Sequence, residues 1–417
     1  MFWRKDPFGC PSYDSRLCLQ RGIDNYELSA QMARNRIPAP PRVEAISKLN
    51  DLEALAESFA AKHGFEPELP SHWNPKPAFA AKIEGWATQP ARSGSLVDYV
   101  YSSDVVLDRR VRARLHEANE RGILLTPSGT TSVVNVCAYL KNIGIRRLIV
   151  QTPVYFTVGA VAEVFGMAVS YVDAWRSDGR YILPSFHKPF DSKTAVWLTL
   201  PIYGASAYFE QQDVAATIDN LPQDIIVVVD ESLAFPDRNC LKLTQSLDRV
   251  VRICTPHKSL CLNGEKVSFI TVPSHLFENM DAWSDCFAGG IGAGGIRSLA
   301  FLADDAFDRA CISARSLIGE QHKKFSVAVS RYRKISVDRD IDGYFAMLYW
   351  PELSSIIGED HTFLTEILTN SQALPIPSTR NHHPAACGFC FRVNLFRLDD
   401  AGLGALDRLM HAVSAFV

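Results

Sequence analysis

The sequence lacks the features that mark membrane, secreted and nucleic-acid-binding proteins. Its 417 residues contain no apolar run long enough to span a bilayer, and the first residues carry no apolar signal core. The formal net charge is only −3, which gives no electrostatic reason to expect a nucleic acid or a membrane surface as a partner. With a hydrophobic content of 47%, the chain is expected to be a cytoplasmic globular protein with a large core.

The sequence also has little that predicts a metal site or a disulfide framework. Its ten cysteines are scattered, and several lie in apolar runs, so they are expected to be buried thiols. The one CxxC, from Cys387 to Cys390, has no second pair and lies in a strand-like run. No metal ligand is therefore predicted, and no internal repeat or low-complexity segment is present.

The most informative stretch is a pair of apolar runs that each end in a chemically useful residue. The run at 225–229 stops at Asp230 and is typical of a parallel strand buried on both faces. A second run at 250–254 is followed four residues later by Lys258. The carboxyl ends of parallel strands are where open α/β sheets bind ligands, so the acid and the lysine are expected to meet there.

An acid and a lysine at neighbouring strand ends have a specific chemical use. A lysine amine can form a Schiff base with an aldehyde cofactor, and a carboxylate can keep a pyridine nitrogen protonated. Taken singly, Lys258 could be a solvated loop residue and Asp230 a helix cap. As an ordered pair they resemble the fold-type I pyridoxal-phosphate enzymes of the class I/II aminotransferase (aspartate aminotransferase) superfamily, and the resemblance runs from about residue 85 to the C-terminus.

The resemblance implies a pyridoxal 5'-phosphate cofactor and gives individual residues a role toward it. Lys258 would hold the cofactor and move protons, and Asp230 would face the pyridine nitrogen. Tyr155 would stack on the ring, and Tyr99 would reach the phosphate bound by the partner subunit, although a core-packed tyrosine is an equal alternative. The residues expected around the phosphate and the phenolic oxygen are Ser128, Gly129, Thr130, Thr255, Lys266 and Tyr203.

The turn at residues 128–130 has a physical reason to bind an anion. Small residues between a strand and a helix free backbone amides to point at a phosphate, and the helix dipole favours negative charge. A plain capped helix start is the alternative. Thr255 belongs to Thr255-Pro256-His257-Lys258, which is similar to the Ser-x-x-Lys motif of the family.

Two residues are predicted to bind the substrate. Arg392 lies within an apolar strand-like run, and a buried arginine requires an anion partner. The resemblance implies that this partner is the α-carboxylate of an amino acid, and a structural ion pair is the alternative. Gly85 lies where the family commonly places a glycine near the substrate.

Three positions depart from the family pattern. Tyr203 stands where an asparagine usually contacts the phenolic oxygen, Leu233 replaces a tyrosine, and Lys266 replaces an arginine on the phosphate. Lysine keeps the charge but loses the bidentate fork of arginine. These changes bear on the reaction type more than on cofactor binding.

The fold expected is α/β, with a large domain built on a mostly parallel seven-stranded sheet flanked by helices. A small α+β domain would be formed by both ends of the chain. A helix is predicted at 51–63, two long helices at 297–318 and 321–337, and the Pro-rich segments near residue 75 as extended connectors without an assigned role. The expected limits are 1–80 for an N-terminal arm that joins the small domain, 81–310 for the large domain and 311–417 for the small domain.

The predicted function is that of a homodimeric pyridoxal-phosphate enzyme acting on an L-amino acid, most simply an aminotransferase. A decarboxylase, a β- or γ-elimination or replacement enzyme, a cyclase or an oxidase is the alternative, because one fold hosts many chemistries. A cofactor-binding regulator is a further alternative, but the sequence offers no clear DNA-binding module.

Overall fold

The computed structural model describes most of the chain and divides it into two compact units, Met1–Asn50 and Asp51–Val417. The fold described below is that of the second unit. The described residues are 44–87, 109–115, 121–186, 190–238, 244–264, 266–288, 291–378 and 383–417.

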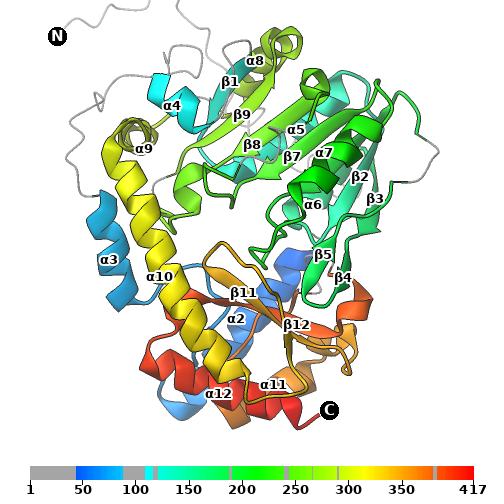
Figure 1. The fold of residues 1–417 in the computed structure, drawn as a ribbon. Coiled ribbons are helices and arrows are strands. Elements are labelled where there is room, and N and C mark those ends of the chain that lie inside the picture. Colours follow the sequence, from blue (N-terminus) through cyan, green and yellow to red (C-terminus); the bar gives the residue numbers. More distant parts are fainter. Residues whose placement is uncertain are drawn as a thin grey trace, which may run out of the picture. The chain divides into compact units, whose positions relative to one another are not determined.

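A seven-stranded sheet in the order β1-β9-β8-β7-β6-β2-β3 forms the larger part of the unit (Figure 1). Neighbouring strands pair in parallel except at β9, which is antiparallel to both β1 and β8. This confirms the predicted mostly parallel seven-stranded sheet. The strands are β1 (Arg121–Thr126), β2 (Arg147–Thr152), β3 (Ala168–Asp173), β6 (Thr194–Thr199), β7 (Ile226–Glu231), β8 (Val250–Cys254) and β9 (Ser268–Pro273).

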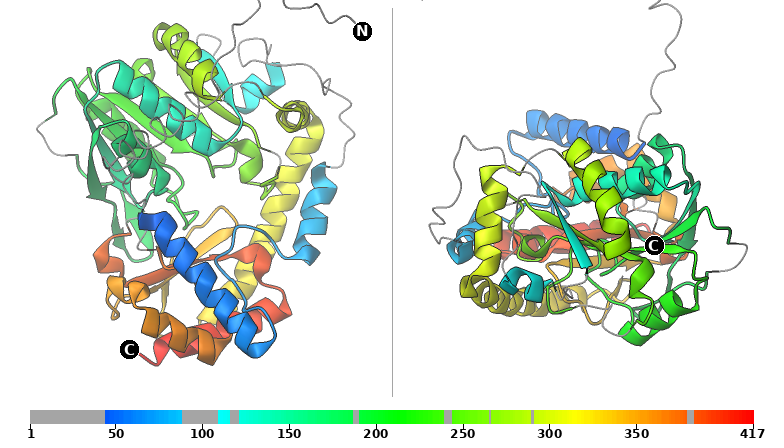
Figure 2. Two further views of the ribbon diagram at one scale, coloured as in Figure 1. Left: turned by 180° about the vertical axis from the view of Figure 1, so that it is seen from behind. Right: turned by 90° about the horizontal axis from the view of Figure 1, so that it is seen from above.

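The central strands are apolar on both faces because helices cover both. Trp197 and Val228 pack into a cluster with α5, α6 and α8, whereas their neighbours Val196 and Val227 pack into a second cluster with α7. In the rear view α5 and α8 lie side by side over the sheet (Figure 2). The helices are α5 (Gly129–Asn142), α6 (Thr157–Val164), α7 (Gln211–Asn220) and α8 (Ser274–Ala288).

Both ends of the described chain contribute to the smaller part. Its antiparallel sheet has the order β10-β11-β12, and α2 and α12 share one hydrophobic cluster through Phe59 and Leu406. The predicted small α+β region is therefore confirmed, while the three domain limits stay predictions. Its elements are α2 (Glu44–His63), β10 (Ser336–Val337), β11 (Phe345–Trp350), η5 (Ser355–Glu359), α11 (His361–Ser371), η7 (Ala385–Cys387), β12 (Phe389–Asn394), η8 (Leu395–Arg397) and α12 (Asp400–Ser414).

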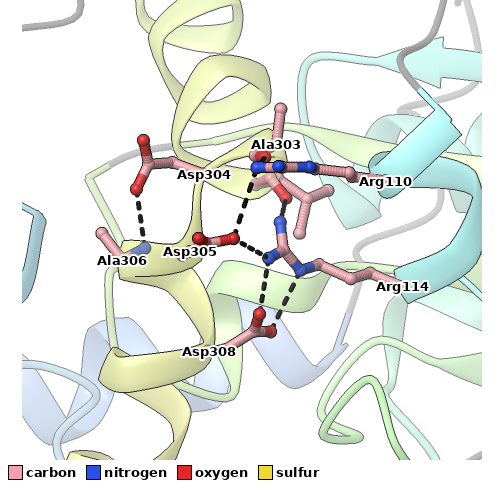
Figure 3. A network of polar contacts seen from close by, with 8 residues as sticks. Arg110, Arg114, Ala303, Asp304, Asp305, Ala306 and Asp308 are labelled. Carbon is pink, nitrogen blue, oxygen red and sulfur yellow. Dashed lines mark hydrogen bonds and ion pairs between the residues drawn. The ribbon is translucent and has the colours of Figure 1, made fainter.

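A single long helix, α10 (Asp305–Val329), joins the two parts, with α3 packed along it. The two helices predicted at 297–318 and 321–337 are wrong in their boundary: the break lies at Asp304, whose side chain accepts a hydrogen bond from the amide of Ala306 and caps α10 (Figure 3). The remaining elements are α3 (Pro77–Ala87), α4 (Arg109–Arg114), β4 (Trp175–Ser177), β5 (Arg180–Ile182), η3 (Leu247–Arg249), η4 (Pro256–Lys258) and α9 (Ala293–Ala303).

Ion pairs fix α4 against the start of α10. Arg114 pairs with Asp308 at 2.6 Å and also donates to the carbonyl of Leu302, and Arg110 lies 3.3 Å from Asp305 (Figure 3). The acidic side chains lie in the first turn of α10, where the helix dipole favours negative charge.

None of the helices that the structure describes is both long and apolar enough to cross a membrane.

Candidate active site

Six strands of the large sheet run in the same direction and end at one edge of it, namely β1, β2, β3, β6, β7 and β8. Thr199 lies opposite Asp230 in the register of β6 and β7. The antiparallel β9 begins at this edge instead, which brings Lys266 to it. A cavity of about 360 Å³ at this edge is lined by Trp73, Asn74, Ser128, Gly129, Thr130, Tyr155, Thr255, His257, Lys258, Asn263 and Lys266.

A second, narrower cavity continues from the first. The two share Gly129, Thr130, Tyr155 and Lys258 as lining residues. The second is completed by Val133, Thr199, Leu200, Pro201, Tyr203, Asp230, Ser232 and Leu233.

Most of the residues predicted from the sequence therefore line one continuous site. Arg392 joins them through Trp73, as described below. Gly85 does not: it lies in α3, is exposed, and lines neither cavity. Tyr99 lies outside the described residues.

Lys258 lies at the end of the short helix η4, with its amine 4.8 Å from the centre of the Trp73 ring and 6.0 Å from that of Tyr155. Burial lowers the pKa of Lys258 to about 8, although the charge of Asp230 acts in the opposite direction. An amine with such a pKa is partly neutral near neutral pH, and the neutral form is the nucleophile and the base.

Asp230 is held by the residue two positions after it. Its Oδ1 accepts hydrogen bonds from the amide of Ser232 at 3.0 Å and from the Ser232 hydroxyl at 2.6 Å. Burial raises the pKa of Asp230, while the Ser232 hydrogen bonds and the charge of Lys258 act to lower it. The carboxylate is thus oriented and can face a protonated ring nitrogen.

The start of α5 has the geometry of a capped helix N-terminus. Ser128 caps the helix, with its Oγ accepting from the amide of Thr131 at 3.1 Å. At Gly129 an added Cβ would lie 3.3 Å from Thr255 Oγ1 and 3.4 Å from Ser232 Oγ, so a larger residue would crowd both hydroxyls. The capped helix start is therefore observed, and its backbone amides could also receive an anion.

A chain of buried hydroxyls connects α5 to the loop that carries Thr255. Ser268 Oγ lies 2.8 Å from Ser132 Oγ and 3.1 Å from Thr255 Oγ1, and Ser132 Oγ lies 2.7 Å from Thr126 Oγ1. The chain runs from β1 through α5 and β9 to the loop after β8. It fixes Thr255, and therefore the loop that carries Lys258, relative to α5.

Two tyrosines form the wall of the cavity. Tyr155 and Tyr203 are stacked, with ring centres 5.5 Å apart and planes inclined by 30°. Leu200 and Leu233 line the same narrow cavity and make this wall partly apolar. Thr199 Oγ1 is buried at this wall and has no hydrogen-bond partner among the described residues.

Arg392 reaches the site from β12 and is only 3% exposed. Its guanidinium carbon lies 4.2 Å from the Trp73 ring centre and 4.6 Å from that of Phe345, and its Nε donates to the carbonyl of Ser71 at 3.1 Å. Its Nη1 and Nη2 are buried without a hydrogen-bond partner among the described residues. A buried guanidinium with two unpaired donors is suited to bind a carboxylate.

Sequence reasoning missed several residues of the site. Trp73 and Asn74 lie in the Pro-rich connector, for which no role was predicted, and no role was predicted for Asn263. His257 is also part of the wall: burial lowers its pKa to about 3, and its Nε2 accepts from the amide of Val267 at 3.3 Å. A tryptophan between two prolines was the available signal, because a large aromatic residue in a polar connector needs a surface to pack on.

The described residues contain no group of three or more His, Cys, Asp or Glu side chains that could hold a metal ion.

The sequence and the structure were compared with those of known proteins. No family model matches the sequence. The chain is 21% identical over 187 residues to histidinol-phosphate aminotransferase 2 of Oceanobacillus iheyensis; the match covers 43% of this chain and 50% of that protein, so it spans about half the length of that relative.

Solved structures match over nearly their whole length. Bna3p of Saccharomyces cerevisiae, described as a putative kynurenine aminotransferase, has a TM-score of 0.68 at 16% identity, over 87% of this chain and 95% of that one. The aspartate aminotransferase of Thermotoga maritima has a TM-score of 0.67 at 16% identity, over 88% and 97%. The Escherichia coli protein YbdL, with a described methionine aminotransferase function, has a TM-score of 0.64 at 15% identity, over 87% and 96%. The chain therefore has the fold of the aminotransferases of fold type I.

Proposed function

We propose that this protein is a pyridoxal-phosphate-dependent enzyme that acts on an L-amino acid, and that it is an aminotransferase. The observation that carries the proposal is the meeting of three groups in one site at the carboxyl edge of the sheet. These groups are an amine with a lowered pKa, a buried carboxylate and a buried guanidinium with unpaired donors, at Lys258, Asp230 and Arg392. The fold shared with solved aminotransferases supports the same function.

The residues present fit the proposed cofactor. Gly129, the start of α5 and the charge of Lys266 suit its phosphate, and Thr255 adds a hydroxyl beside them. Asp230 suits the ring nitrogen, and Tyr155 offers an aromatic face. When bound, the cofactor supplies an electron-accepting ring that stabilises negative charge at the α-carbon of the substrate.

The residues of the chain would then do the remaining work. Lys258 would hold the cofactor, and its neutral amine would accept a proton from the substrate α-carbon and later return one. Arg392 binds the substrate carboxylate with its two free donors, which fixes the α-carbon relative to Lys258. Trp73 and the stacked tyrosines limit the access of water.

One observation keeps a second reaction type open. Leu233 lines the narrow cavity where the family pattern implies a tyrosine, so fewer polar groups would hold the ring. Such a change favours a specialised reaction, namely decarboxylation, elimination or replacement at the side chain, cyclisation or oxidation. We further propose a cytoplasmic homodimer, in which Tyr99 of one subunit reaches the site of the other.

The purified protein with pyridoxal phosphate and a keto-acid acceptor should be tested against a panel of L-amino acids, with products identified by mass spectrometry. An aminotransferase converts one amino acid to its keto acid and aminates the acceptor. We expect Lys258→Ala to abolish conversion and Arg392→Lys to raise KM more than it lowers kcat.

A product that has lost carbon dioxide or a side-chain group would show that the enzyme catalyses the second reaction type and not transamination. Full activity of Lys258→Ala would refute the proposed function.

A further inference from the structure

The segment at residues 70–76, predicted as a plain connector, is fixed in place by contacts from distant parts of the chain. Ser71 Oγ donates to the carbonyl of Arg392 at 2.7 Å. The carbonyl of Trp73 accepts from Asn394 Nδ2 at 3.1 Å and from Asn263 Nδ2 at 3.2 Å. Because Asn394 ends β12 and Asn263 follows Lys258, the two parts of the fold hold Trp73 jointly.

The indole of Trp73 contacts both cations that the proposed function requires. The amine of Lys258 lies 4.8 Å from its ring centre, and the guanidinium carbon of Arg392 lies 4.2 Å from it. Both distances are in the range of cation–π contacts. An amino acid that places its amine at Lys258 and its carboxylate at Arg392 must therefore lie along this ring.

The other rings near Trp73 make this surface aromatic. Phe345 meets Trp73 edge to face with ring centres 4.9 Å apart, and Tyr203 lies at 6.5 Å and is stacked on Tyr155. Aromatic and aliphatic groups pack well against such rings.

A second carboxylate on the substrate would find little to bind. Among the described residues that line the larger cavity, the cationic side chains are Lys258 and Lys266, and both have a role toward the cofactor. His257 also lines this cavity, and burial lowers its pKa to about 3, so its ring is neutral. The unpaired Nη1 and Nη2 of Arg392 would be used by the α-carboxylate of the substrate, which leaves them unavailable to a second carboxylate.

We propose that Trp73 determines substrate choice, and that the site takes 2-amino acids with an aromatic or large apolar side chain in preference to acidic ones. The inference rests on the proposed function, because it assumes that an amino acid bridges Lys258 and Arg392. Trp73 forms the wall on which the side chain of the substrate packs.

The test compares L-phenylalanine with L-aspartate as amino donors for the cofactor-loaded wild type, Trp73→Ala, Trp73→Phe and Trp86→Ala. Trp86 is a partly buried tryptophan of α3 that does not line the cavity, so it is the matched control. Loss of an apolar contact of this size changes discrimination by roughly tenfold or more. We expect Trp73→Ala to lose about that factor in kcat/KM for phenylalanine relative to aspartate, Trp73→Phe to keep most of the preference, and Trp86→Ala to keep all of it.

Binding of non-reacting acids separates substrate packing from chemistry. Calorimetric titration with 3-phenylpropionate and with succinate should show tighter binding of the first to the wild type and loss of that difference in Trp73→Ala. A wild type that prefers aspartate and succinate, or a preference unchanged in Trp73→Ala, overturns the inference and leaves the proposed function intact. A wild type that converts no amino acid at all refutes the proposed function instead.

Discussion

The environment of Lys258 and Asp230 moves both groups toward their neutral forms. Burial lowers the pKa of Lys258 to about 8 and raises that of Asp230, and the attraction between the two charges opposes both shifts. Lys258 is a base, so it loses its proton as the pH rises through its lowered pKa. It therefore becomes nucleophilic well below the pH at which an ordinary lysine does.

The rate of pyridoxal-phosphate uptake by the apoprotein should follow this titration. We expect the initial rate, measured by absorbance, to rise as the pH increases through about 8 and then to level off. The same reaction with N-acetyl-lysine in solution corrects for titration of the reagent itself. A rate that keeps rising up to the ordinary lysine pKa of 10.5 would show that Lys258 is not desolvated as described.

Ser232 should support cofactor binding through Asp230. Its hydroxyl donates to Asp230 Oδ1 at 2.6 Å, and Ser232→Ala removes this bond while leaving the backbone bond in place. Loss of a hydrogen bond to a charged group costs about 1.5–3 kcal/mol, so the Kd for pyridoxal phosphate should rise by about tenfold or more. Ser232→Thr keeps the hydroxyl and should bind nearly as the wild type does. If Ser232→Ala and the wild type bind pyridoxal phosphate with equal affinity, Ser232 does not support cofactor binding.

The sequence could predict residues whose position follows from local pattern. Asp230 and Lys258 each follow an apolar strand-like run, and the structure brings them into one site. Gly85 has no such local signal, and the structure leaves it on an exposed face of α3. Ser232 was not recognised, because a serine after Asp-Glu gives no indication of which atom it will bind.

At the scale of elements, strands were easier to predict than the division between helices. Each strand that ends at the site is a short apolar run, whereas α9 and α10 follow each other with a single residue between them. The predicted break, between 318 and 321, includes Gly319, and glycine is a poor helix former. The observed break is at Asp304, where a side-chain cap starts a new helix.

Gly319 inside α10 offers a direct test of this assignment. An added Cβ would meet nothing within 4 Å, and the residue has no positive φ. Gly319→Ala should therefore raise the free energy of unfolding by about 0.5–1 kcal/mol, because alanine loses less backbone entropy.

Urea denaturation measures the change, and Gly204→Ala is the opposite control. Its φ of +81° is unfavourable for alanine, so the substitution should destabilise the protein. A destabilised Gly319→Ala would show that the helix is interrupted there.

At the scale of the whole molecule, the site depends on contacts between the two ends of the chain. The Nε of Arg392 donates to the carbonyl of Ser71, which lies 321 positions earlier. The side chain of Asn394 donates to the carbonyls of His72 and Trp73. Local periodicity carries no information on such contacts, which is why the role of the 70–76 segment could not be predicted while the sheet could.

The fold of the whole molecule was predicted because a few residues, such as Asp230 and Lys258, resemble the pattern of the fold-type I enzymes. The solved aminotransferases match at 16% identity or less among those compared, yet over most of the chain. In this chain both faces of the sheet are buried, and Leu200, Leu233 and Trp73 line the walls of the site at the edge of the sheet.

The most direct test of the central claim is chemical identification of the lysine that holds the cofactor. The protein loaded with pyridoxal phosphate is reduced with borohydride, digested, and analysed by peptide mass spectrometry. We predict one phosphopyridoxyl group, on the peptide that contains Lys258. A protein that binds no cofactor, or one modified at another lysine while Lys258 stays free, would contradict the account.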